Sequence, residues 1–363
     1  MAAEEVGKAS AHLVLPYNLN TPDVTMDKSV SLIIPVKDPD QRFQKCLAHI
    51  ARCNPSPMEV IIVLDGDRGQ PIPTADMTNL RTIRLHDTGG PGRARNTGAR
   101  EARGDILLFI DADVLVPADI LRRIRNDFAG SVRPDAVFGS YDDKPPAGNH
   151  VSQYKNLLHH FVHQNASPDA FTFWTGCGAI LRKRFLEVDG FSEEYCQPSI
   201  EDIELGYRLK EAGATILLDK TIQVTHLKQW TLSDLLRTDF LRRALPWSRL
   251  ILRSGPMHND MNINMAGRVS VILSWLIIAL LLLIPVDPLF AWGAALSFLL
   301  LFMLNKDLFF FFCGKKGVWF MLGAIPLHFL YFLTSGLAFA LALARHLFGT
   351  SPVPARDKTK GLE

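Results

Sequence analysis

The chain has 363 residues, a formal net charge of +2 at pH 7 and 48% hydrophobic residues. This balanced charge gives no sign of a basic nucleic-acid-binding surface, so we expect no nucleic-acid partner. Its five cysteines form no Cys-x-x-Cys pair, which is typical of reduced thiols facing a cytosol and not of a disulfide framework. The opening sequence MAAEEVGKAS has no basic segment followed by an apolar run, so no secretory signal is expected.

After a loosely ordered lead-in of residues 1–28, short apolar runs alternate with helical patterns. Strands are predicted at 29–36, 58–67, 80–86 and 105–113, and helices at 38–53 and 90–104. This alternation predicts an α/β domain with a parallel or mostly parallel sheet, in which ligands bind at the carboxyl ends of the strands. Charged side chains follow three of these strands: Lys37, Asp38, Asp65, Asp67, Asp111 and Asp113. We therefore expect one shared site at this edge of the sheet.

From residue 135 to 225 the pattern loosens to α+β, with helices predicted at 150–164 and 199–213. The first of these helices carries a histidine cluster, His159, His160 and His163. A zinc site would need a third ligand and a supporting outer shell, so we favour a solvated or acceptor-facing surface for this cluster.

Arginines alternate with apolar residues at helical spacing over residues 231–256, at Arg237, Arg242, Arg243, Arg249 and Arg253. Such a stretch directly before an apolar segment indicates helices that lie in a membrane interface. Three apolar segments follow, at 266–286, 288–304 and 318–344, the last interrupted by Pro326. We expect three spans, and the basic residues before the first and third place the N-terminal domain in the cytosol.

Asp111 and Asp113 end the most apolar strand of the first half, in ILLFIDADV. Alternate residues of an extended chain point to the same side, so the two carboxylates could together bind Mg²⁺ or Mn²⁺ and, through it, a substrate phosphate. Two alternatives fit the same residues. One is a solvated turn, and the other is a haloacid-dehalogenase-type phosphatase with Asp111 as its nucleophile.

The order of motifs resembles a family 2 glycosyltransferase of the membrane-bound branch. The resemblance rests on SLIIPVKD, VIIVLDGD, GGPGRARNTGAREARGDILLFIDAD, WTGCGAILRK and SIEDIELGYRL. It implies a GT-A-type, Rossmann-like mixed-sheet domain followed by interfacial helices and a C-terminal transmembrane helical region. The expected boundaries are a lead-in at 1–28, the glycosyltransferase domain at 29–230, interfacial helices at 231–264, the transmembrane region at 265–346 and a tail at 347–363.

The resemblance also implies roles for individual residues. The nucleotide would be bound by Pro35, Lys37, Asp38, Asp65, Asp67, Arg93, Arg95, Asn96 and Asp111. The metal ligands would be Asp111, Asp113 and His226. Small residues would let the backbone approach the sugar and acceptor at Trp174, Gly176, Cys177 and Gly178, with Arg243 and Trp247 also on the acceptor side. Asp202 would be the general base, with Glu201 beside it in the catalytic group.

Asp202 has a second interpretation, because SIED also fits a capping box at the start of a helix. The processive Q-x-x-R-W motif is absent, so a polymer-forming synthase is not expected. The sequence thus predicts a metal-dependent inverting enzyme in a plasma or inner membrane, which moves a sugar from a nucleotide donor, preferably UDP-linked, to a lipid-linked acceptor. The alternatives are a non-lipid glycan acceptor and a non-catalytic membrane partner of the same fold.

Overall fold

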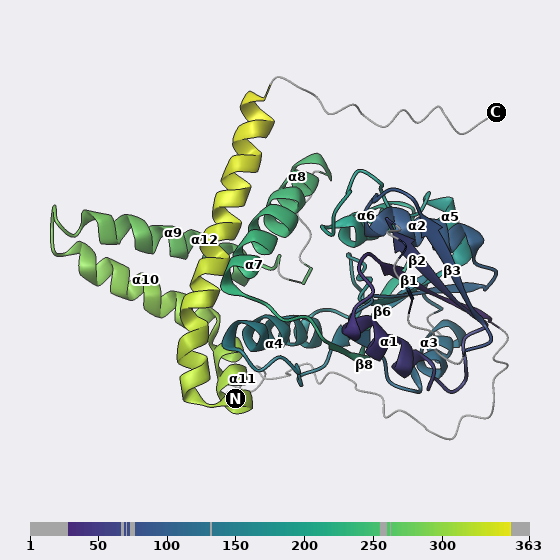
Figure 1. The fold of residues 1–363 in the computed structure, drawn as a ribbon. Coiled ribbons are helices and arrows are strands. Elements are labelled where there is room, and N and C mark those ends of the chain that lie inside the picture. Colours follow the sequence, from purple (N-terminus) through teal and green to yellow (C-terminus); the bar gives the residue numbers. More distant parts are fainter. Residues whose placement is uncertain are drawn as a thin grey trace, which may run out of the picture.

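The computed structural model describes residues 28–66, 69, 71–72, 77–130, 133–254, 260–261 and 263–349. Eight strands in these residues form one mixed sheet in the order β3-β2-β1-β4-β7-β6-β8-β5 (Figure 1). The bounds are β1 Val30–Val36, β2 Glu59–Asp65, β3 Leu80–Leu85, β4 Ile106–Ile110, β5 Val114–Leu115, β6 Ala136–Tyr141, β7 Cys177–Leu181 and β8 Ile216–His226.

Strand direction explains why the charged residues meet. β3, β2, β1 and β4 run parallel, β7 is antiparallel to β4 and β6, and β6 is parallel to β8. β1, β2 and β4 are buried along nearly their whole length, because helices cover both faces of the sheet. The predicted mixed, largely parallel sheet is confirmed. The carboxyl ends of these three strands lie along one edge, directly before Lys37, Gly66 and Asp111.

Helices pack on both faces of this sheet. α1 and α3 share one hydrophobic core with the sheet, and α2, α5 and α6 share the other. Their bounds are α1 Gln41–Ile50, α2 Pro91–Glu101, α3 Ile120–Ala129, α5 Arg182–Glu187 and α6 Glu201–Glu211. The apolar residues of α1 recur at helical spacing (Phe43, Cys46, Leu47 and Ile50), so one face of the helix is buried while the other stays polar.

Gly206 lets α6 lie close to the loop before β7, and this contact positions Asp202, the candidate base. A Cβ at this position would lie 2.5 Å from the backbone nitrogen of Phe173 and 2.8 Å from Cα of Thr172. Because the helix and the loop before β7 touch here, Asp202, one turn earlier, reaches Thr175.

Replacing Gly206 by Ala should therefore destabilise the protein by about 1–3 kcal/mol, the usual cost of overpacking. Helix propensity alone predicts the opposite sign, a gain of about 1 kcal/mol. Denaturant unfolding of Gly206→Ala, beside Gly148→Ala as control, measures the sign. A Cβ on Gly148 meets nothing within 4 Å, and equal stability of the two variants would contradict the contact.

The remaining helices lie beside the sheet domain. They are α4 His150–Asn165, α7 Leu232–Arg237, the π-helix η1 Thr238–Ala244, α8 Leu245–Ser254, α9 Met265–Leu283, α10 Phe290–Leu304, α11 Lys306–Lys316 and α12 Val318–Phe348. α9 and α10 lie side by side as a hairpin that extends away from the sheet domain (Figure 1). α12 runs between this hairpin and the sheet domain.

α4 joins the sheet domain to these helices. Its apolar face, with Tyr154 and Leu157, packs on Phe312 of α11 and on α12. The hydroxyl of Tyr154 lies 3.0 Å from Nδ1 of His328, on α12. The same histidine continues the contact to Asn305 at 3.3 Å. Apolar packing and a buried polar chain therefore attach the two halves to each other.

Two described helices, α9 and α12, are each long and apolar enough to cross a membrane. α10 and α11 are bent by 67° from each other and supply a third candidate only when taken as one span. The sequence predicted an apolar segment at 318–344 that is interrupted by Pro326. In the structure α12 continues through Pro326 as one helix of 31 residues. The helix α11 was not predicted.

Candidate active site

A cavity of about 640 Å³ opens at the edge where β1, β2 and β4 end. Thirteen of the predicted site residues line it: Pro35, Lys37, Asp38, Asp65, Arg95, Asp111, Asp113, Trp174, Glu201, Asp202, His226, Arg243 and Trp247. These residues come from segments far apart in the chain, which the topology brings to one place. Asp67, the remaining predicted strand-end acid, lies outside the described residues.

Arg95 is the central cation of the cavity wall. Its side chain is 4% exposed, and it forms ion pairs with Asp111 at 2.7 Å and Glu201 at 3.0 Å. The guanidinium of Arg95 also lies over the ring of Phe191. A buried cation needs such partners, because an isolated charge in the interior is strongly disfavoured. Arg95 therefore fixes Asp111 and Glu201, and it leaves one Asp111 oxygen free of this contact.

Asp202 is the more exposed of the two acids at the start of α6, because it is partly exposed whereas Glu201 is buried. Glu201 has one oxygen engaged by Arg95 and the other by the backbone N–H of Ser199 at 2.8 Å. Asp202 accepts from the backbone N–H of Ile203 at 2.9 Å on one oxygen, and from the N–H and hydroxyl of Thr175 at 3.3 Å on the other. Burial, reinforced by the neighbouring Glu201 charge and opposed by Arg95, raises the pKa of Asp202 to about 6. This carboxylate can exchange a proton near neutral pH.

The predicted capping box at SIED differs from the structure. Ile200 is the N-cap residue, and no side chain caps the helix there. The backbone N–H of Ser199 is taken by Glu201, while the Ser199 hydroxyl donates to the carbonyl of Arg242 at 2.8 Å. Asp202 accepts the first-turn N–H of Ile203 with one oxygen, and it lines the cavity as well.

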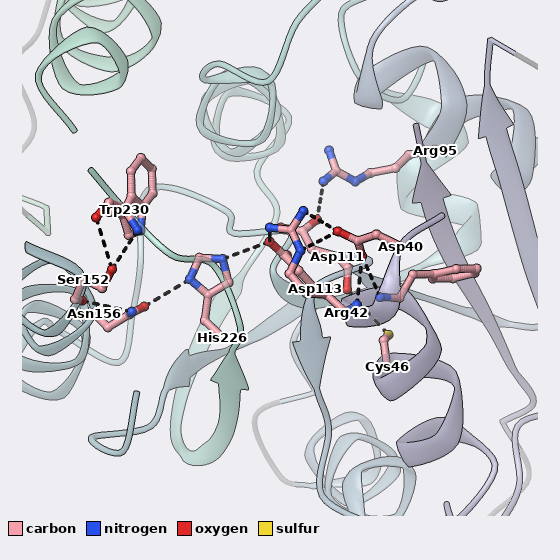
Figure 2. A network of polar contacts seen from close by, with 11 residues as sticks. Asp40, Arg42, Cys46, Arg95, Asp111, Asp113, Ser152, Asn156, His226 and Trp230 are labelled. Carbon is pink, nitrogen blue, oxygen red and sulfur yellow. Dashed lines mark hydrogen bonds and ion pairs between the residues drawn. The ribbon is translucent and has the colours of Figure 1, made fainter. Parts of the chain in front are cut away.

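Asp113 and His226 form a pair suited to a divalent cation (Figure 2). Nδ1 of His226 lies 3.0 Å from Oδ1 of Asn156, whose amide nitrogen donates to Ser152. Nδ1 therefore carries the ring proton and donates it in a hydrogen bond to Asn156. Nε2 is then unprotonated, and its lone pair faces a carboxylate oxygen of Asp113 at 3.5 Å.

Two facing acceptors are stabilised by a cation between them. Burial would raise the pKa of Asp113, but nearby positive charges, those of Lys228 and Arg42 among them, lower it below its usual range, so its carboxylate is ionised. One carboxylate and one imidazole, completed by substrate phosphate and water, fit Mn²⁺ or Mg²⁺. In the part of the chain that the structure describes, no three acidic, histidine or cysteine ligands gather for a closed metal site.

Asp65 supports the loop that forms the nucleotide side of the cavity. Its two oxygens accept the backbone N–H groups of Gly89 and Gly90, at 2.7 and 2.9 Å. Gly90 has φ = 88°, and a Cβ there would lie 2.6 Å from the backbone of Cys196, so only glycine suits this turn. Each Asp65 oxygen retains a second acceptor site for a ligand.

Two predicted nucleotide contacts lie elsewhere. Asn96 bonds to both backbone groups of Phe191 and to Glu193, so it holds the segment before α6 and is buried outside the cavity lining. The side chain of Arg93 covers Gly89, where a Cβ would lie 2.3 Å from its Cδ. Neither residue is among those that line the described cavity.

The small residues around Trp174 serve the protein's own packing. A Cβ on Gly176 would lie 2.2 Å from the Trp174 ring, and one on Gly178 would lie 2.3 Å from the Trp174 carbonyl. Cys177 is buried in β7. In the structure these glycines give room to Trp174, which lines the cavity, and a close approach of their backbone to the substrate stays a prediction.

Sequence reasoning missed the aromatic stack behind the metal pair. Tyr141 stacks on His226, with ring centroids 4.4 Å apart, and on His159 at 5.4 Å. All three histidines of the predicted cluster are buried, and His160 and His163 contact backbone carbonyls. They therefore do not form the solvated surface that was one of the two expectations, whereas His159 and His163 line the cavity, and the acceptor-facing alternative stays a prediction. Helical spacing showed that His159 and His163 share a face, but the sheet edge that covers this face had no sequence signal.

Cations line the side of the cavity nearest the C-terminal helices. They are Arg242 and Arg243 of η1 and Lys228, whose Nζ lies 3.8 Å from the centre of the Trp230 ring. Nη1 of Arg243 contacts Nε2 of His159 at 2.8 Å. No carboxylate pairs with these three cations among the residues that the structure describes. An anion is therefore the chemical complement of this side.

The fold and the site together define a GT-A-like domain. Residues 31–189 match the model of the Glycosyl transferase family 2, and the chain therefore carries a family 2 glycosyltransferase domain. Since Asp111 is held by a buried arginine within such a domain, the phosphatase alternative is wrong.

Relatives agree with this class. The Validoxylamine A glucosyltransferase of Streptomyces hygroscopicus subsp. limoneus is 26% identical over 227 residues, which cover 53% of this chain and 50% of that protein. The Pre-mycofactocin glycosyltransferase of Mycobacterium tuberculosis is 22% identical over 243 residues, which cover 64% and 50%. The chain spans about half the length of these curated relatives. The mannosyltransferase PcManGT from Pyrobaculum calidifontis, solved with GDP-Man and Mn²⁺, matches with a TM-score of 0.49 and 14% identity over 92% of both chains.

Proposed function

We propose that this protein is a metal-dependent inverting glycosyltransferase, which moves one sugar from a nucleotide donor, preferably UDP-linked, to a lipid-linked acceptor at the cytosolic face of a membrane. The observation that carries the proposal is the convergence of Asp113, Asp202 and Arg243 on one cavity. The family match of residues 31–189 supports the class of reaction.

The donor occupies the edge formed by β1, β2 and β4. Asp113 and His226 hold the cation, with Asn156 fixing the imidazole tautomer. When bound, Mn²⁺ or Mg²⁺ neutralises the charge of the leaving diphosphate. Asp65, beside the Gly89–Gly90 turn, and Lys37 face the nucleoside side of the same cavity.

Asp202 is the general base of the transfer. It takes the proton of the acceptor hydroxyl while that oxygen bonds to the anomeric carbon and the bond to the diphosphate breaks. A single displacement of this kind inverts the configuration and needs no covalent intermediate. Thr175 orients the Asp202 carboxylate, and the pKa of about 6 leaves it ionised at neutral pH.

The acceptor enters from the side of η1 and α8. Arg242, Arg243 and Lys228 suit an anionic headgroup such as a phosphate, and Trp247 offers an aromatic face for a sugar or lipid stem. The apolar helix α12 passes beside these elements and packs on α9, which exposes large side chains such as Ile272, and this suits a lipid environment. A lipid substrate could thus reach Asp202 from the membrane surface.

Donor binding tests this function on the full-length chain in lipid nanodiscs. With Mn²⁺ present, UDP-glucose, UDP-N-acetylglucosamine or GDP-mannose at about 100 times its Kd should raise Tm by about 5 °C or more. Slow release of free nucleoside diphosphate should accompany the shift. Omission of Mn²⁺ or substitution of free glucose is the control. A set of donors that gives neither a shift nor hydrolysis with Mn²⁺ would favour the non-catalytic alternative.

A further inference from the structure

The segment η1 carries two of the cavity-lining arginines, Arg242 and Arg243, on a π-helix of seven residues, Thr238–Ala244. π-Helical turns are rare, and they occur mostly where function requires an unusual placement of side chains. Contacts outside η1 are therefore needed to explain why this conformation persists and why Arg243 points into the cavity.

Two contacts join η1 to α4 in register. Nζ of Lys155 lies 2.6 Å from Oδ1 of Asp239, and their side chains are only 6% and 9% exposed. Four residues further on in each element, Nη1 of Arg243 lies 2.8 Å from Nε2 of His159. The positively charged donor belongs to α4 in the first contact (Lys155) and to η1 in the second (Arg243). An exchange of partners would therefore place these two cations beside each other.

The second contact depends on a neutral imidazole. Nε2 of His159 accepts from Arg243, so the ring proton belongs to Nδ1. Burial, together with the positive charge of Arg243, holds the pKa of His159 well below its usual range. Arg243 thus has a fixed position and, among the described residues, no carboxylate within ion-pair distance, although its charge is felt by Asp202 across the cavity.

We propose that Lys155 and Asp239 are positioning residues, which hold η1 in its π conformation and thereby present Arg243 to an anionic group on the acceptor. This inference rests on the proposed function and adds the device that builds its acceptor site. The ion pair is remote from the reacting atoms and acts only through Arg243.

A soluble probe measures the effect on the full-length chain in nanodiscs: hexyl phosphate, with hexanol as its uncharged counterpart. Asp239→Asn should weaken hexyl phosphate binding at least tenfold and leave hexanol binding unchanged. Arg243→Met should weaken it similarly, and the double variant should lose no more than Arg243→Met alone, because both changes remove one interaction. Asp234→Asn, an exposed acid on neighbouring α7, is the matched control.

Further variants separate positioning from general stability. Lys155→Glu combined with Asp239→Lys reverses the pair and should restore hexyl phosphate binding to within about threefold of the wild type. Where Asp239→Asn does not fold, Lys155→Met with Asp239→Leu replaces the pair by apolar contact, and tenfold weaker binding is again expected.

Three results would overturn the proposal. They are unchanged hexyl phosphate affinity in a folded variant that lacks the pair, additive losses in the double variant, and equal weakening of Mn²⁺–UDP binding, which would assign Arg243 to the donor. Failure of the proposed function has a different signature, since the wild-type protein would then show no Mn²⁺-dependent donor binding at all.

Discussion

Asp202→Asn is expected to lower kcat for sugar transfer by about 10²–10⁴, the usual contribution of a general base. The amide keeps the shape of the side chain and the contact with Thr175 but cannot take the acceptor proton. Donor binding should stay within twofold, because Asp113 and Asp65 are untouched. Glu211→Gln, at the far end of the same helix, is the control. A transfer rate in Asp202→Asn near that of the control would remove Asp202 from the mechanism.

The pH dependence gives the same residue a second signature. Because the pKa of Asp202 is raised to about 6, the wild-type rate should rise with pH up to about 6 and level off above it. The sign for stability is opposite. A raised pKa means that the folded state prefers the protonated acid, so the stability it contributes is complete below about pH 4 and is lost as pH rises through 6. Asp202→Asn should therefore melt higher than the wild type at pH 8. A lower Tm there would contradict the burial argument.

Asp113→Asn is expected to weaken Mn²⁺-dependent donor binding at least 100-fold, because it removes the only ionised carboxylate of the proposed ligand pair. The neutral amide would still fit beside His226 and Arg42, so the fold should be retained. Calorimetric titration of UDP with and without Mn²⁺ separates the two effects, since binding of UDP alone should change little.

Asn156→Ala is the matched variant for the outer shell of this site. It removes the partner that sets the tautomer of His226, and losses of about 10–100-fold in metal affinity are usual for such positions. Asn165→Ala, an exposed amide on the same helix, is its control. Unchanged Mn²⁺ affinity in Asp113→Asn would overturn the metal assignment, and unchanged affinity in Asn156→Ala would overturn only the role of the tautomer.

The parallel strands and their terminal acids could be predicted because both signals are local. An apolar run such as ILLFI followed by Asp111 and Asp113 indicates a buried strand with polar groups at its exposed end, and parallel direction brings several such ends together. Asp65, Asp113 and Asp202 do meet at one cavity. The family match explains why motifs as short as these were informative in combination.

The roles of Asn96, Gly176 and Gly178 could not be predicted, because each depends on a neighbour far from the expected ligand. Asn96 bonds to the segment at Phe191, ninety-five positions later, and the glycines give room to Trp174. The register of α4 against η1 was also invisible, since Lys155 and Asp239 are separated by 84 residues and match no motif. Position in a motif indicated that a residue matters but not what it touches.

The path of α12 restricts how the chain can lie in a bilayer. Its 31 residues extend about 46 Å, well beyond a hydrocarbon core of about 30 Å, whereas α10 extends only about 22 Å. α12 also packs against η1 and α8, which border the cavity, as well as against α9.

A helix that accompanies solvent-facing elements for part of its length has only the remainder available for lipid. The hairpin of α9 and α10 follows Asp260, whose carboxylate accepts the backbone N–H groups of Phe171 and Thr172, and it ends at α11, which packs on α4, so both of its ends lie beside the sheet domain (Figure 1). For a chain that enters a bilayer, a re-entrant hairpin and an obliquely seated α12 would keep Arg345, the first basic residue after the third apolar segment, on the side of the catalytic domain. Arg345 and the arginines before the first apolar segment would then share one side of the membrane, as the positive-inside tendency favours.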